Sequence, residues 1–235
     1  NLWRKNSNDI YNANTGNVGI GVSGPQSLLH VRGGAVLFDS TLGVTPVGGA
    51  GTRLMWIPEK AAFRAGRVTG TDWDAVNIGQ YSFGAGWNVQ ASAPYSVAIG
   101  GSAVASGNQS ISLGSGTAIG YRSFSLGAAT QASGPGDAFA IGYGTLSNGL
   151  ASFAGGNIST AIGHQSFSFG DSCRAQADQS VAMGDSSVAS GKAAVSMGAY
   201  NFATGAHSFA TGYRSTASGI NGIAMGDRSI ASGDY

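Results

Sequence analysis

The sequence is poor in charged residues, and it contains no long apolar run. Of its 235 residues only 12 are Lys or Arg and 11 are Asp or Glu, which gives a net charge of +1. Nucleic acids and anionic membranes need a clustered basic surface, so we expect neither as a partner. No apolar run approaches the ~18 residues of a membrane helix, so we expect no direct membrane insertion by this segment. The first residues, NLWRKNSND, lack the pattern of a signal peptide.

Proline and cysteine are also scarce, whereas glycine is abundant. Five prolines, and glycines without a three-residue period, exclude a collagen helix. The single cysteine, Cys173, can form neither an internal disulfide nor a metal cluster. The 40 glycines could signal disorder, but disordered chains combine low hydrophobicity with high net charge, and 42% of these residues are hydrophobic. The glycines therefore need a structural explanation.

From Ser82 onward the chain repeats the pattern S-V-A-I-G-x-x-x-x-A-x-G-x-x, as in Ser180–Ala193 (SVAMGDSSVASGKA). The first glycine of each unit falls at 86, 100, 114, 127, 142, 156, 170, 184, 198, 212 and 226, so eleven copies follow a 14-residue period with one spacing of 13 and one of 15. Fourteen residues suit two short strands and two tight turns, with glycine supplying the positive φ angles of the turns. Stacked coils of this kind form a parallel β-solenoid, in which each strand pairs with its counterpart in the next repeat.

Side chains alternate between the two faces of a strand, so columns of the repeat can be assigned to surfaces. Two columns hold only small residues: one lies two positions before the first glycine, as at Ala98, and the other five positions after it, as at Ala105. A 14-residue coil is thin, so we expect these columns to face each other inside it. The column after the second strand is polar, as at Ser106 and Ser190, and can stay in water.

Two bulky apolar columns, three residues and one residue before the first glycine, should then point out of the coil. A continuous apolar stripe marks an interface, so we expect assembly along the first strands into a closed ring, in which three copies would share a core. Each large side chain buried there contributes roughly 1.5–3 kcal/mol, so a single chain should be poorly stable. The predicted interface consists of Phe83, Val97, Ile99, Ile111, Leu113, Phe124, Leu126, Phe139, Ile141, Phe153, Phe167, Phe169, Val181, Met183, Val195, Met197, Phe209, Ile223 and Met225.

The SVAIGxxxxAxGxx units resemble the head domains of trimeric autotransporter adhesins, the YadA-like family. This resemblance covers residues 82–235 and implies a left-handed parallel β-roll, a homotrimer, and extracellular display on a bacterial cell surface for attachment. Asn17–Val31 (NVGIGVSGPQSLLHV) resembles shaft segments of phage tail fibres, although Val22 stands where Thr is common. That second resemblance implies an intertwined trimeric β shaft.

These patterns divide the chain into a shaft-like segment at residues 1–40, a β-hairpin cap or connector at residues 41–81, and the β-roll at residues 82–235. Within the connector, Leu54–Val68 predicts two strands joined by a turn at Glu59-Lys60. A solenoid needs protection at its terminal edge, so we expect Trp56, Trp73 and Phe63 to cap the open end of the roll.

Enzymatic patterns are weak. Gly19, Gly21 and Gly24 have the spacing of the dinucleotide fingerprint, but Pro25 and Gly33-Gly34 leave too little room for the helix that the fingerprint requires. The histidines at 30, 164 and 207 share no column, and the thin rod should offer no pocket of ~300 Å³. We therefore expect no enzymatic activity, no catalytic residue and no cofactor.

Three aspartates, Asp171, Asp185 and Asp227, follow the first glycine of their units, and the first two lie in adjacent coils. Carboxylates ~5 Å apart on neighbouring strands could chelate a cation. The favoured alternative is that each aspartate bonds its own backbone amides in the turn, so no metal site is assigned.

Exposed tyrosine and arginine are the usual anchors of recognition. The candidates for surface binding, at or near turns, are Tyr95, Tyr121, Arg122, Tyr143, Arg174, Tyr200, Tyr213 and Arg214. The chain is therefore predicted to be a trimeric extracellular fibre or adhesin head that attaches to a host-surface protein, matrix or glycan. The alternative is a tail-fibre component of a phage virion or a contractile injection system, acting as a receptor-binding fibre or as a structural spacer.

Overall fold

The structure is a computed structural model that describes residues 3–6, 9–12 and 16–234. These residues form β-strands and turns, with two single 3-10 turns, η1 (Pro58–Lys60) and η2 (Ala75–Asn77), as the only helical elements among them. The all-β prediction is therefore confirmed. The chain divides into two units, Asn1–Asp39 and Ser40–Tyr235.

The first unit contains two small pairs of strands. Strand β1 (Trp3–Asn6) pairs antiparallel with β2 (Asp9–Asn12), and β3 (Val18–Ile20) pairs parallel with β4 (Leu29–Val31). No side chain described between residues 16 and 39 is buried, although this stretch is rich in leucine and valine. The intertwined shaft needs further chains, so it stays a prediction.

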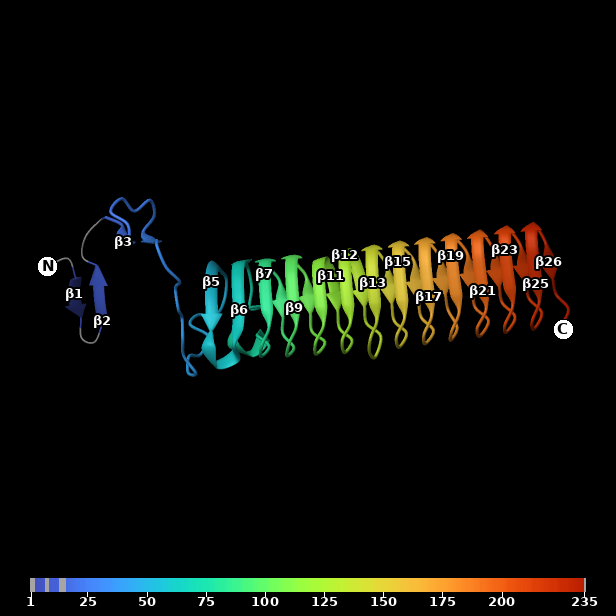
Figure 1. The fold of residues 1–235 in the computed structure, drawn as a ribbon. Coiled ribbons are helices and arrows are strands. Elements are labelled where there is room, and N and C mark those ends of the chain that lie inside the picture. The colour runs from blue at the N-terminus through green and yellow to red at the C-terminus, as the bar shows by residue number, and fades with distance from the viewer. Residues whose placement is uncertain (1–2, 7–8, 13–15, 235) are drawn as a thin grey trace. The chain divides into compact units, whose positions relative to one another are not determined.

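The second unit is dominated by the parallel β-solenoid that the repeat predicts (Figure 1). A regular coil has a first strand of five residues, a second strand of two residues and two turns. The first strands are β7 (Phe83–Trp87), β9 (Val97–Gly101), β11 (Ile111–Ala118), β12 (Phe124–Ala132), β13 (Phe139–Tyr143), β15 (Phe153–Asn157), β17 (Phe167–Asp171), β19 (Val181–Asp185), β21 (Val195–Ala199), β23 (Phe209–Tyr213) and β25 (Ile223–Asp227). The second strands are β8 (Gln90–Ala91), β10 (Val104–Ala105), β14 (Leu146–Ser147), β16 (Thr160–Ala161), β18 (Arg174–Ala175), β20 (Val188–Ala189), β22 (Phe202–Ala203), β24 (Thr216–Ala217) and β26 (Ile230–Ala231), while β11 and β12 each run through both positions.

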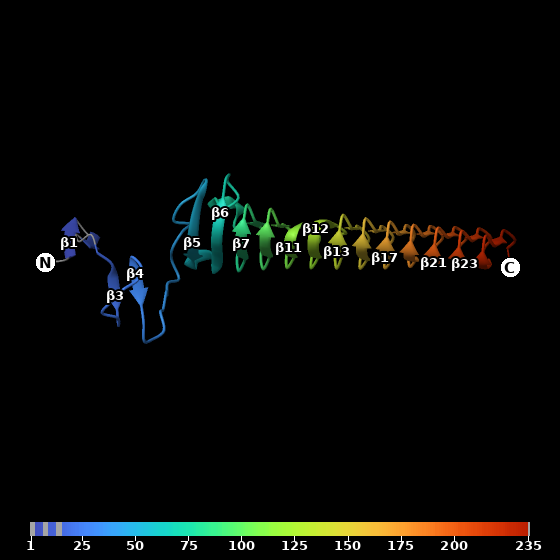
Figure 2. The same cartoon turned by 90° about the horizontal axis from the view of Figure 1, so that it is seen from above.

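Each strand pairs in parallel with its counterpart one coil away, so the coils stack in a single row (Figure 2). In β19 and β21, for example, Val181 pairs with Val195 and Gly184 with Gly198. The 14-residue period is therefore the stacking period of the backbone, and equivalent side chains form ladders along the roll.

The glycines of the repeat allow the coils to approach one another closely. A Cβ atom on Gly170 would lie 2.0 Å from the carbonyl oxygen of Gly184, and one on Gly205 would lie 2.0 Å from that of Gly219. The prediction that glycine supplies the positive φ angles of the turns is wrong for the regular coils: the first glycine of each unit has a positive φ, as Gly170 does at 134°, but it lies within a strand. The left-handed corners of the turns are instead occupied by other residues, such as Gln165 (φ 56°) and Ser172 (φ 55°).

The interior of the roll is lined by small side chains, which confirms the assignment of the two Ala/Ser columns. Ala98 and Ala105 are fully buried, as are their equivalents in most coils. Two further columns are buried as well, four positions before the first glycine, as at Ser96, and three positions after it, as at Cys173 and Asn201. Cys173 lies in the first turn between β17 and β18 with its side chain in this interior, and burial raises the pKa of its thiol.

One coil departs from the period. The spacing of 13 arises in a first turn, where the pairing of β11 with β12 shifts register between Ser115 and Thr117. The shortened turn has no side chain at Gly116 to point into the interior, and the side chain of Thr130 from the next coil fills that space. A Cβ atom on Gly116 would lie 2.2 Å from the hydroxyl oxygen of Thr130. The compensating extra residue lies in the next coil between Ala132 and Phe139.

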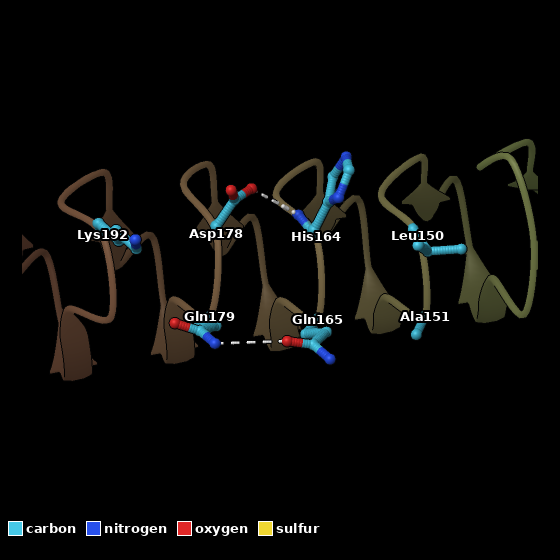
Figure 3. Close-up of a pocket in the computed structure, with 7 residues that line it drawn as sticks. All are labelled: Leu150, Ala151, His164, Gln165, Asp178, Gln179 and Lys192. Carbon is cyan, nitrogen blue, oxygen red and sulfur yellow. Dashed lines mark hydrogen bonds between the residues drawn. The ribbon is translucent and has the colours of Figure 1, made fainter.

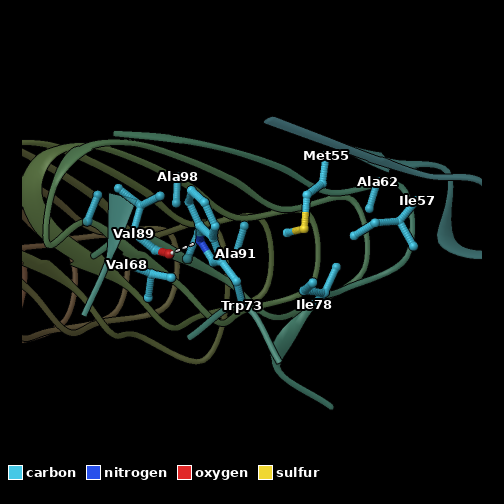
Figure 4. Close-up of a cluster of buried hydrophobic side chains, with 11 residues drawn as sticks. Met55, Ile57, Ala62, Val68, Trp73, Ile78, Val89, Ala91 and Ala98 are labelled. Atoms are coloured by element: carbon cyan, nitrogen blue, oxygen red, sulfur yellow. Dashed lines mark hydrogen bonds between the residues drawn. The ribbon is translucent and has the colours of Figure 1, made fainter. Parts of the chain in front are cut away.

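A cap precedes the regular coils and shares its hydrophobic core with the first of them. Strand β5 (Gly51–Ile57) pairs antiparallel with β6 (Ala62–Val68) across η1, which confirms the predicted strand–turn–strand, and β6 pairs parallel with β7. Trp73 is fully buried and its indole N–H donates to the carbonyl of Val89 at 2.9 Å (Figure 4). The hydrophobic cluster of the cap comprises Met55, Ile57, Ala62, Val68, Trp73, Ile78, Val89, Ala91, Ala98, Ala103 and Ala105.

The cap also buries one cation. Arg64 occupies the inner small-residue column, because it pairs with Gly84 across β6 and β7. Its guanidinium donates to the carbonyl of Ala91 at 2.7 Å and to the hydroxyl of Ser82 at 2.9 Å. Burial lowers the pKa of Arg64 to about 10, so the group stays charged at neutral pH. A Cβ atom on Gly84 would lie 3.0 Å from Cδ of Arg64, so this glycine makes room for the arginine.

Candidate interaction surfaces

The predicted interface residues lie together on one side of the roll, which we call the apolar face. None of them is buried by the chain itself, because they occupy the outer positions of the first strands. The phenylalanine rings of four consecutive coils stack along the roll. Their centroids are separated by 4.6 Å for Phe124–Phe139, 5.2 Å for Phe139–Phe153 and 4.9 Å for Phe153–Phe167. The structure therefore supplies a continuous ladder of large apolar side chains. Its burial against other copies of the chain stays a prediction.

The apolar face continues onto the cap, which the sequence did not reveal. Trp56 pairs with Phe63 across β5 and β6, and Phe63 pairs with Phe83 across β6 and β7, with these last two rings stacked at 5.2 Å. Trp56 is 43% exposed and Leu54, on the same side of β5, is 72% exposed. The prediction that Trp56 and Phe63 cap the roll is therefore wrong, because strand alternation turns both outward. Of the three residues, only Trp73 fills the cap.

One gap in the apolar face is filled by neighbouring rings. Gly155 takes the position that Ile141 and Phe169 hold in the adjacent coils. A Cβ atom there would lie 2.7 Å from the ring of Phe169 and 2.9 Å from that of Phe153. The two phenylalanine rings therefore pack over the glycine, and the face stays closed.

The predicted tyrosine and arginine candidates are all exposed, but they do not form one surface. On the first turns Tyr200, Tyr213 and Arg214 cluster, with the guanidinium carbon of Arg214 4.9 Å from the centre of the Tyr213 ring and 5.7 Å from that of Tyr200. On the second turns Arg122 lies 4.9 Å from the ring of Tyr121 and forms an ion pair with Asp137 at 2.8 Å.

The remaining candidates are separate from these clusters. Tyr95 stacks on Tyr81, a neighbour that the sequence did not reveal, with ring centroids 4.9 Å apart. Tyr143 and Arg174 make no ring or cation–π contact with the residues that the structure describes. The candidates therefore divide into two clusters, one stacked pair and two single side chains.

The aspartates do not bond in the way we favoured. Asp171 and Asp185 are direct neighbours in the pairing of β17 with β19. Each accepts from the hydroxyl of the following serine, Ser172 at 2.9 Å and Ser186 at 2.7 Å. The backbone amides of these serines are already used, because each donates to a carbonyl of the preceding coil. Nowhere in the described part of the chain do three His, Cys, Asp or Glu side chains gather as a metal site would require.

The other sequence signals stay apart. The chain bends between β3 and β4, and β4 takes the place of the helix that the dinucleotide fingerprint needs after Gly24. His30 accepts a hydrogen bond at Nδ1 from the amide of Gln26 at 3.4 Å, whereas His164 and His207 lie in second turns of different coils.

A surface hollow lies on the second turns of four consecutive coils (Figure 3). It has a volume of about 330 Å³, so the prediction that the rod offers no pocket near this size is wrong. That prediction considered the interior, whereas this hollow lies between outward side chains. We call it the turn trough, and it is lined by Leu150, Ala151, His164, Gln165, Asp178, Gln179 and Lys192.

Comparison with known families identifies the repeat. The YadA head domain repeat (2 copies) matches residues 91–117, 118–145, 175–201, 189–215, 203–229 and 217–235. These segments all lie in the roll and contain its inner alanine columns and its stacked glycines. No curated protein matches the chain. Among the described residues no helix has the length and apolar character needed to cross a membrane. Through its roll, the chain belongs to the YadA head domain family.

Proposed function

We propose that this chain is the head of a homotrimeric, surface-displayed fibre that attaches its carrier to a host or other surface. The family implies a role like that of trimeric autotransporter adhesins, and its members form homotrimers in general. Attachment to a host-surface protein, matrix or glycan is the specific step that we add. The role is binding, and we propose no catalytic step and no cofactor.

The observation that carries this proposal is the apolar face of the roll. In every coil the first strand carries at least one large apolar side chain on its outer side that the chain leaves unburied, and the cap adds Trp56 and Leu54. A stripe of this length is unfavourable in water, and each large side chain gains roughly 1.5–3 kcal/mol when it is buried. Three copies packed by this face would bury the stripe and leave the turns outward, where a receptor can reach them.

The exposed aromatic and arginine clusters support attachment through the turns. Tyr200, Tyr213 and Arg214 present two rings and one guanidinium within 6.0 Å of one another. Such groups supply large contact areas at little cost in side-chain entropy, and they dominate recognition surfaces. We therefore propose this cluster as one contact point for a protein receptor.

An adhesion assay tests the proposal. Beads coated with the purified trimer should be retained on fixed epithelial cells or on a basement-membrane extract above the level of uncoated beads. The Tyr200→Ala, Tyr213→Ala, Arg214→Ala triple variant tests the cluster, because its substitutions are on exposed turns and should leave the roll folded. Absence of retention on every surface tested would contradict attachment and favour a spacer.

A second candidate is a tail-fibre component of a phage or contractile injection system. The observation that favours it is the Asn17–Val31 segment, whose β3 and β4 pair in parallel and leave Leu28 and Leu29 exposed, as a multi-chain shaft would require. The C-terminal region of the full gene would discriminate between the carriers. A membrane-anchored barrel would support the adhesin, and a self-cleaving chaperone domain would support the tail fibre.

A further inference from the structure

We propose that the turn trough is a binding site for a neutral oligosaccharide. This inference deepens the proposed function, on which it rests, by assigning one receptor class to one place on the roll. The trough lies on the second turns and is lined mostly by polar side chains, whereas the apolar face lies on the first strands. None of the trough residues is among the tyrosine and arginine candidates.

Two rows of side chains form the walls of the trough. Leu150, His164, Asp178 and Lys192 occupy equivalent positions in consecutive coils and make one row, and Ala151, Gln165 and Gln179 make the other (Figure 3). Coils stack at ~4.8 Å, a step comparable to the length of one sugar ring. The short side chain of Ala151 leaves one end of the glutamine row open.

The backbone holds these rows in place. Gln165 and Gln179 adopt left-handed φ angles of 56° and 60°, and their amides donate to the carbonyls of Leu150 and His164 in the preceding coil, at 2.7 and 2.8 Å. The carboxylate of Asp178 accepts from the amide of His164 at 2.9 Å. The backbone of the site is therefore fixed before a ligand arrives, which lowers the entropic cost of binding.

The polar side chains of the trough have hydrogen-bonding capacity to spare, unlike the ion pair of Arg122 with Asp137 on other second turns. Arg122 pairs with Asp137, so these two charged groups satisfy each other. In the trough the glutamine side chains share one hydrogen bond of 3.4 Å. Among the described residues, neither the ammonium of Lys192 nor the imidazole of His164 has a hydrogen-bond partner.

The chemistry of the lining fits hydroxyl groups better than charged or apolar ligands. Sugar hydroxyls both donate and accept, and the two glutamine amides do the same, while Asp178 accepts and Lys192 donates. One carboxylate and one ammonium balance, so the trough has no excess charge to attract a polyanion. Leu150 is the one large apolar side chain in the lining, enough to contact the C–H face of a sugar but too little to anchor a peptide.

The volume of about 330 Å³ is at the lower end of small-molecule sites, so one trough should bind weakly. Three troughs on a trimer would act together, and linked sites can exceed the single affinity by roughly 10²-fold or more. The inference therefore predicts weak binding in solution and strong retention on a surface that displays many copies of the glycan.

The test applies the assembled wild-type protein to a printed array of defined neutral and sialylated oligosaccharides. We expect signals on neutral structures, a loss of at least tenfold for the Gln165→Ala, Gln179→Ala double variant, and a comparable loss for Asp178→Asn. The matched control is Gln109→Ala, because Gln109 is an exposed glutamine with φ 59° at the equivalent corner of a coil outside the trough. This control should bind as the wild type does.

Three results would overturn the inference: silence of the wild type on the array, binding confined to sialylated structures, or full binding by both trough variants. The adhesion assay separates this failure from that of the proposed function. If beads still adhere to cells after enzymatic removal of surface glycans, attachment stands and the trough is not responsible. If wild-type beads adhere to no surface, the proposed function itself fails.

Discussion

The cap and the roll distribute large side chains in opposite ways. The cap encloses Ile57, Val68 and Trp73, all at most 1% exposed, in a core made by one chain. The roll encloses alanine and serine, and it carries its phenylalanines on the outside. A 14-residue coil has no interior space for a large ring, whereas the cap hairpin and its 3-10 turns leave enough space to enclose the indole ring of Trp73. The comparison teaches that the cap can be stabilised within a chain, while the apolar surface of the roll needs partners.

The largest expected effect comes from placing a charge on the apolar face. Phe167→Asp should abolish assembly of the trimer, because three carboxylates would be buried among apolar rings without partners. Ser190→Asp, on the exposed polar column, should assemble as the wild type does. Sedimentation velocity of the two variants measures this directly. A monodisperse trimer formed by Phe167→Asp would contradict the assignment of the face.

The second prediction compares two tryptophans of the cap. Trp73→Ala should destabilise the cap by about 3–5 kcal/mol, because it empties a fully buried site and removes the hydrogen bond to Val89. Trp56→Ala should change the denaturation midpoint of the cap little, since its ring is outward, and should instead weaken assembly. Chemical denaturation and sedimentation of both variants separate the effects, and equal losses in denaturation would refute the distinction between core and face.

The third prediction concerns the contact between coils. Gly170→Ala should destabilise the roll by about 2–4 kcal/mol, because its Cβ would meet the backbone of Gly184 and its φ of 134° is unfavourable for alanine. The control is Gly101→Ala, where no atom lies within 4 Å of the added Cβ. Thermal unfolding should show a lower midpoint for the first variant only. Equal midpoints would mean that close stacking of the coils is not what selects glycine.

The smallest effect should distinguish the buried cation of the cap from the neutral interior of the roll. Arg64→Ala and Gly84→Ala should each destabilise the protein by about 1–3 kcal/mol, the first by leaving a cavity and the second by crowding Arg64. Combining them recreates the small pair found in the regular coils, so the double variant should be more stable than the sum predicts, by about 1 kcal/mol. A denaturant double-mutant cycle measures the coupling, and strict additivity would show that the two residues do not share one space.

Much of the roll could be predicted because each coil repeats the same local solution. The period, the inner alanine columns and the outer apolar columns follow from strand alternation, and they were confirmed at Ala98, Ala105 and their equivalents. The strand–turn–strand of the cap followed from its apolar runs around Glu59 and Lys60. These features depend on neighbours that are close in sequence or related by the period.

Other features depended on contacts that have no period. Trp56 and Trp73 look alike in the sequence, and only the pairing of β5 with β6 turns the first outward. Arg64 resembles a surface residue until its register with Gly84 places it inside. The turn trough arises because glutamines meet an alanine on adjacent coils, and the corner positions vary too much along the repeat to reveal this.

The amino-acid sequence by itself determined that this protein is a stack of 14-residue β coils with an apolar outer face, because period and alternation specify both the backbone and the sides of a strand. The tertiary structure alone decided where the face extends, which side chains fill the cap and where the turns leave a hollow. Those outcomes depend on strand register and on the volumes of side chains that meet only after the coils have stacked.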